Sequence, residues 1–273
     1  MNTLIIDEQP AVFRRGDIGQ VTVGSRPIGV TIDHRMLTAG RAKFRRAVYT
    51  SRPIRCPFPI NDVVASWNVA LPEGTGFIVQ LRLGRRREDF WTAFYYLGSW
   101  GTVPKTGVKK IVKDRNGKVH TDYFRSDKSF DRVQYRLLLF STRRDASPTL
   151  RRFTLSCSQS PKRKELPARH RKTIRAGAKK RWARRLNVPF RSQRAEDPKI
   201  AGSVCSPTSV AMVMAYHGVD QPTRTMCDVI WDAEYKIFGN WTRAVQGAYL
   251  FGVPGYLERF AGWQAVKLSL IHI

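Results

Sequence analysis

The residues best suited to chemistry lie in the segment 204–218, VCSPTSVAMVMAYHG, where a cysteine precedes a clearly marked helix. Ser206 is a suitable N-cap, Pro207 fits the first helical position, where no N–H is needed, and Gly218 marks the C-terminal end. The unpaired N–H groups and the positive end of the helix dipole would stabilise a thiolate on Cys205. The segment therefore predicts a cysteine nucleophile, with a buried structural cysteine as the alternative.

A glutamine upstream of this cysteine is a candidate for a second catalytic group. Gln193 ends the segment 187–193, NVPFRSQ, and is followed by a polar loop. Its side-chain amide could donate a hydrogen bond to an oxyanion, while the backbone N–H of Cys205 donates another. Taken alone, a glutamine in a loop is more often only solvated.

The order of these residues resembles papain-like cysteine peptidases of the double-glycine leader peptidase group, over about residues 187–267. That family has Val-Pro-x-x-x-Gln before Cys-x-Pro-Thr-Ser, and usually glycine after the nucleophile, where this chain has Ser206. The matching positions are Val188, Pro189, Gln193, Cys205, Pro207, Thr208 and Ser209. The resemblance implies a papain-like α+β fold that hydrolyses amide bonds of a peptide or protein through an acyl-enzyme on Cys205, with Gln193 assisting and no cofactor.

A thiolate of this kind requires a base, normally a histidine. His217 lies on the same predicted helix as Cys205, about 18 Å along its axis, which is too far. Three histidines precede the peptidase-like region, whereas the family's histidine follows the cysteine: His34, His120 and His170. His272 lies in 268–273, a segment that resembles a translated sequencing adapter. We therefore expect residues 187–267 to be a truncated, inactive front half that lacks its histidine and aspartate.

Trp241 has two alternative roles in the peptidase-like region. It lies in the sequence Gly-Asn-Trp at 239–241 and could line a substrate cleft. Large aromatic side chains are, however, common in protein cores, so the core position is favoured.

The remaining cysteines and the apolar content indicate the compartment. Cys56, Cys157 and Cys227 show no metal-ligand spacing and are expected to be reduced core residues, so no metal is expected. The chain has no apolar run near 20 residues and no basic start followed by an apolar signal core. These features favour a cytoplasmic protein without a transmembrane segment, in which Cys205 stays free to react.

The first half of the chain has the alternation of antiparallel strands. Apolar side chains occupy every second position over 77–83 and again over 133–139, and Asn116-Gly117 is a hairpin signal. Several shorter runs separated by turn residues add to this pattern, so residues 17–157 are predicted to form an all-β antiparallel sandwich. Residues 1–16 are expected to be an N-terminal tail. Aromatic residues of this domain, among them Trp67 and Trp100, favour a core over a ligand platform.

A strongly basic segment, 158–186, is expected to link the sandwich to the region 187–267. Residues 162–185 carry twelve basic side chains against Glu165, within a chain whose net charge is +27. Such a run attracts polyanions without sequence preference. The chain is thus predicted to be multidomain and, in function, a cysteine peptidase. The alternatives are a polyanion-binding or adhesion protein with an inactive peptidase-like domain, and another thiol acyl-transferase or peptidoglycan amidase.

Overall fold

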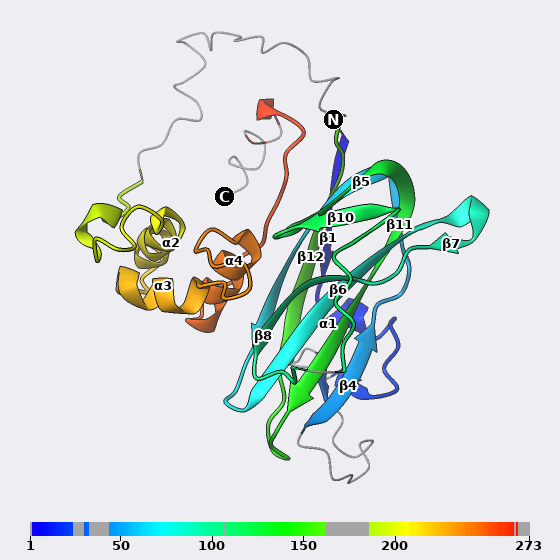
Figure 1. Ribbon diagram of the computed structural model, residues 1–273, viewed down its shortest axis with the longest axis horizontal. Coiled ribbons are helices and arrows are strands. Elements are labelled where there is room, and N and C mark those ends of the chain that lie inside the picture. The colour runs from blue at the N-terminus through cyan, green and yellow to red at the C-terminus, as the bar shows by residue number, and fades with distance from the viewer. Residues whose placement is uncertain are drawn as a thin grey trace.

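The structure is a computed structural model that describes residues 2–23, 30–32, 44–105, 107–161, 186–264 and 266. Apart from the short α1, strands come first in the chain and helices last, and Figure 1 shows the helices beside the sheet. The strands are β1 (Asn2–Glu8), β2 (Val21–Val23), β3 (Val30–Ile32), β4 (Arg45–Thr50), β5 (Ile54–Ala70), β6 (Thr75–Arg85), β7 (Phe90–Trp91), β8 (Tyr95–Gly101), β9 (Lys113–Asp114), β10 (Gly117–His120), β11 (Tyr123–Ser141) and β12 (Thr149–Gln159). The helices are α1 (Pro10–Phe13), α2 (Cys205–Tyr216), α3 (Thr223–Ile230) and α4 (Trp241–Leu250), with 3-10 turns η1 (Arg86–Glu88) and η4 (Gln193–Ala195).

The described strands form one continuous sheet, and the long strand β11 explains how it closes over a core. The first part of β11 pairs antiparallel with β5 and β10, and its second part pairs antiparallel with β4 and β6. The register between β11 and β5 shifts between Arg125 and Arg132, and such bulges bend a strand. The expected antiparallel β domain is therefore present, although its two layers are parts of the same sheet.

The side-chain alternation read from the sequence is confirmed on β6 and β11. Phe77, Val79, Leu81 and Leu83 all point into the core, as do the alternate residues of β11 from Val133 to Leu139. Most of the aromatic residues that could have formed a ligand platform are core residues: Trp67, Tyr95, Tyr96 and Trp100 are buried, whereas Trp91 is half-buried. The predicted hairpin is also present, with β9 and β10 joined at Arg115-Asn116.

Residues 1–16 are not a tail, which corrects the sequence prediction. All seven residues of β1 pair with β12, from Asn2 opposite Gln159 to Glu8 opposite Phe153. Phe13 of α1 is fully buried against Tyr49. The segment 2–8 has three consecutive apolar residues, 4–6, and no alternation that would mark it as a strand, but the open edge of β12 gives it backbone partners.

The three C-terminal helices pack around a second, smaller core. Its buried residues are Ala211, Met214, Met226 and Ile230. Gly218 ends α2 as predicted, with a positive φ of 82°. The N–H of Gly218 bonds the carbonyl of Ala215 and the N–H of Val219 bonds that of Met214, which is the Schellman arrangement.

Helix α4 connects this helical region to the sheet. Gln246 of α4 is fully buried, and its side chain bonds both backbone groups of Val69 in β5. The Val69 N–H donates to Oε1 at 3.0 Å, and Nε2 donates to the Val69 carbonyl at 2.8 Å. The amide thus replaces backbone partners that Val69 would otherwise need.

The chain that follows α4 lies along the polar outer face of β5 and β12. Backbone N–H groups of Leu257 and Arg259 donate to Ser66 and Ser156, at 2.9 and 2.8 Å. The Arg259 guanidinium also pairs with the buried Asp62 carboxylate at 2.7 Å. These contacts hold the helical region against the β domain.

Some sequence predictions fall outside the described residues. They include most of the linker 158–186, with its basic run 162–185, and the segment 268–273 with His272. None of the described helices is long and apolar enough to cross a membrane.

Candidate active site

Cys205 is the first residue of α2 and its side chain is exposed. The first backbone bond of the helix runs from the Thr208 N–H to the Val204 carbonyl, at 3.1 Å. The N–H groups of Cys205 and Ser206 therefore have no intrahelical acceptor. An anion formed at this end of α2 would face free donors and the positive end of the helix dipole.

The helix begins two residues earlier than predicted. Val204 is the N-cap residue and makes no side-chain cap, so Ser206 is not the N-cap and Pro207 is the third helical residue. The proline costs nothing there, because an N–H at the third position would also lack an intrahelical acceptor. The Thr208 hydroxyl instead bonds back to the Val204 carbonyl at 2.7 Å.

The exposed thiol shares one face of α2 with apolar side chains. Ser209, Val213 and Tyr216 follow Cys205 at intervals of four, four and three residues, and all are exposed. The side chain of Val213 is 51% exposed and that of Tyr216 is 42% exposed. All seven residues of α2 from Val210 to Tyr216 are apolar, a composition typical of a buried helix.

Gln193 begins η4 in the loop that leads to Cys205. Its Nε2 donates to the Ala201 carbonyl at 2.7 Å, which ties the start of the loop to a residue four positions before the thiol. A primary amide carries two N–H donors, so one is left for another acceptor. The described residues give that second donor no partner.

Trp241 is not a core residue, contrary to the favoured expectation. It is the first residue of α4, directly after the N-cap Asn240, and is 50% exposed. The Asn240 side chain accepts from the N–H groups of Thr242 and Arg243. The Trp241 N–H donates to Asp122 of the β domain at 2.9 Å.

A buried aspartate that the sequence reasoning did not consider holds this turn. Asp232 accepts a hydrogen bond from the Asn240 amide at 2.7 Å and pairs with Arg243 at 3.0 Å. The sequence did carry a signal for the start of α4, because Asn240 precedes Trp241 and asparagine is a strong N-cap residue. Asp232 lies eight residues before Asn240 in the same connection between α3 and α4, and no recognised sequence pattern has that spacing.

The described histidines are His120 and His217, and neither is hydrogen-bonded to Cys205. His217 is the C-cap of α2, at the opposite end from the thiol. His120 lies in β10 and stacks on Tyr123, with ring centroids 5.2 Å apart. Burial and the charges of Lys118 and Arg125 lower the pKa of His120.

The three other cysteines are buried and unpaired by disulfides, in line with the expectation. Burial raises the pKa of Cys227 to about 11, which keeps that thiol protonated near neutral pH. Contact with Cys56 and burial likewise raise the pKa of Cys157 well above its ordinary value. Cys205 is thus the accessible thiol among the four.

Comparison with known families gives two matches. Residues 7–158 match the model described as a Peptidase C39 N-terminal domain, and residues 185–267 match that of the Peptidase_C39 like family. The first match alone spans more than half of the chain. The search of curated proteins gave no match to the chain.

Proposed function

The chain belongs to the family of C39 papain-like cysteine peptidases, and from this we propose that it hydrolyses a peptide bond through an acyl-enzyme on Cys205. The observation that carries the proposal is the exposed Cys205 thiol at the N-terminus of α2, inside the matched region. The nearby N–H groups would stabilise the thiolate and the charge that develops on the substrate carbonyl.

The chemistry proceeds in two steps. The Cys205 thiol gives its proton to an imidazole, which becomes an imidazolium, and its sulfur attacks the carbonyl carbon. The resulting oxyanion accepts hydrogen bonds from the Cys205 N–H and from the second Gln193 amide N–H. The intermediate collapses to a thioester as the amine leaves with a proton from that imidazolium. Water then attacks the thioester and gives up a proton to that imidazole, which passes it to the departing Cys205 sulfur, so that the acid and the thiol are released.

We propose that the imidazole belongs to a histidine that follows Cys205 in the chain and lies outside the described residues. Its supporting observation is the exposed apolar face formed by Val213 and Tyr216 on the Cys205 side of α2. A helix that is apolar all round is stable when a second layer covers it. Such a layer would bring a base to the thiol, and a protein limited to residues 1–267 would show no peptidase turnover.

The experiment compares two lengths of the protein. The source gene is expressed to its natural stop codon and, separately, to residue 267, and both products are incubated with a library of labelled peptides. We expect cleavage only by the longer product, and its complete loss in Cys205→Ala. The control, Cys227→Ala, removes a buried thiol and keeps cleavage.

A second readout uses the chain as it stands. Native protein treated briefly with iodoacetamide should be alkylated on Cys205 and not on Cys56, Cys157 or Cys227, as peptide mass spectrometry would show. Undiminished cleavage by Cys205→Ala would refute the assignment of the nucleophile.

A further inference from the structure

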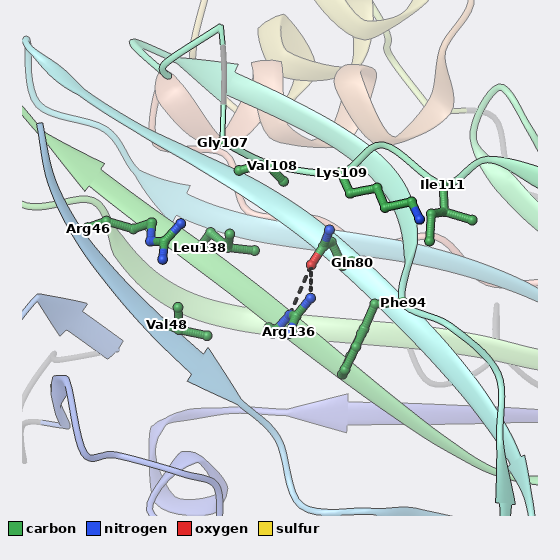
Figure 2. Close-up of a pocket in the computed structure, with 10 residues that line it drawn as sticks. All are labelled: Arg46, Val48, Gln80, Phe94, Gly107, Val108, Lys109, Ile111, Arg136 and Leu138. Carbon is green, nitrogen blue, oxygen red and sulfur yellow. Dashed lines mark hydrogen bonds between the residues drawn. The ribbon is translucent and has the colours of Figure 1, made fainter.

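The outer face of the layer formed by β4, β11 and β6 carries a cavity of about 340 Å³. Figure 2 shows the side chains of these strands below it and the segment from Gly107 to Ile111 crossing beside them. We call this cavity the arginine pocket. It is lined by Arg46, Gln80, Lys109 and Arg136 together with apolar side chains described next.

One part of the arginine pocket is apolar. Val48 of β4 and Leu138 of β11 are cross-strand neighbours and form its floor. Phe94, Val108 and Ile111 add apolar surface around them. Apolar walls with a few polar groups are the usual composition of a ligand site.

The polar part of the arginine pocket is cationic. Arg46, Lys109 and Arg136 line it, and none of the lining residues is an aspartate or a glutamate. Arg136 directs Nε and Nη2 to the neutral Gln80 Oε1, at 2.9 and 2.6 Å. Its guanidinium also lies over the Phe94 ring, 4.0 Å from the centroid, as Figure 2 shows. The guanidinium is therefore held in position while its charge is not neutralised.

A neighbouring arginine adds to this excess of charge. Arg82 lies 4.7 Å from the same Phe94 ring and bonds the neutral Gln134 at 2.7 Å. Burial, and then the charges of Arg82 and Arg46, lower the pKa of Arg136. By contrast, Arg152 elsewhere on the β domain is paired with Asp7 at 2.7 Å.

We propose that the arginine pocket binds an amphiphilic anion, with an oxyanion headgroup on Arg136 and Arg46 and an apolar body on Val48 and Leu138. The planar guanidinium matches the geometry of a carboxylate or a phosphate, and an anion would relieve the repulsion among the cations. Stacking of a nucleobase is disfavoured, because guanidinium groups already occupy the Phe94 ring.

Calorimetric titration of the full chain with four probes tests this proposal. Octanoate and octyl phosphate carry both a headgroup and an apolar body, acetate carries the headgroup alone, and octan-1-ol carries the apolar body alone. We expect one-to-one binding of octanoate, octyl phosphate or both, at least about tenfold tighter than binding of acetate or octanol. The tighter of the two anions identifies the headgroup.

Three variants locate the binding. Arg136→Gln should weaken binding at least about tenfold, since a charge-assisted bond is lost. Arg46→Gln, at an exposed position where folding is not at risk, should weaken it as well. Arg144→Gln makes the same change of net charge at an exposed site outside the pocket and should leave the affinity unchanged.

Three results would overturn the proposal. One is that neither octanoate nor octyl phosphate binds. Another is that octan-1-ol or acetate binds as tightly as these two anions. The third is that Arg144→Gln loses as much affinity as Arg136→Gln, which would indicate a general effect of net charge.

Discussion

Gln246 offers the sharpest test of how the helical region is held to the β domain. Replacement by leucine keeps the side-chain size but removes the two hydrogen bonds to Val69. Both residues are fully buried, so water cannot replace the lost partners. Each buried backbone group left without a partner costs roughly 1–3 kcal/mol, and two such groups cost about 2–6 kcal/mol.

The assay is urea unfolding of wild type and Gln246→Leu, followed by tryptophan fluorescence. We expect a lower midpoint at an unchanged slope, and faster amide hydrogen exchange at Val69. The control is Gln159→Leu, because Gln159 is exposed and its side chain bonds the exposed Asn2 at 3.3 Å. The control should change the free energy of unfolding by less than about 0.5 kcal/mol. A Gln246→Leu protein as stable as this control would show that the contact does not hold α4 in solution.

Two further predictions concern a buried acid and a helix end. Burial raises the pKa of Glu8 above its ordinary 4.5, so its contribution to stability is fully present below that value and is lost as the pH rises through the higher folded pKa. In Glu8→Gln, the free energy of unfolding measured by urea titration should therefore fall less than in wild type as the pH rises through the folded pKa of Glu8. The control is Glu73→Gln, at an exposed position, which should leave this fall unchanged. A fall in Glu8→Gln as large as in wild type would contradict the prediction. Gly218→Ala should cost about 1 kcal/mol, because φ is +82° and nothing else lies near the added methyl. Gly202→Ala, equally open but without a positive φ, should cost less, and equal losses in thermal melts would argue against strain at residue 218.

Local patterns were sufficient for the strands β6 and β11 and for the C-terminal end of α2. The alternation over 77–83 and 133–139 correctly assigned the inward faces of β6 and β11, since the residues that face one side of a strand recur at every second position. The start of α2 was displaced by two residues, because Ser206 has the right chemistry for an N-cap but the N-cap is Val204. Residues 2–8 could not be recognised as a strand, because their apolar residues are consecutive and do not alternate, and the pairing with β12, about 150 residues away, leaves no local signal.

The sequence by itself determined the antiparallel class of the β domain, the thiol at a helix start and the likeness to papain-like peptidases. These depend on periodicity and on adjacent residues, which the chain carries locally. The tertiary structure decided that Cys205, unlike the three buried cysteines, faces outward, that Trp241 is exposed, and that Arg136 and Arg46 meet over an apolar floor. Such properties follow from which distant segments pack together, and the side chains that cover or expose a group need not be near it in the sequence.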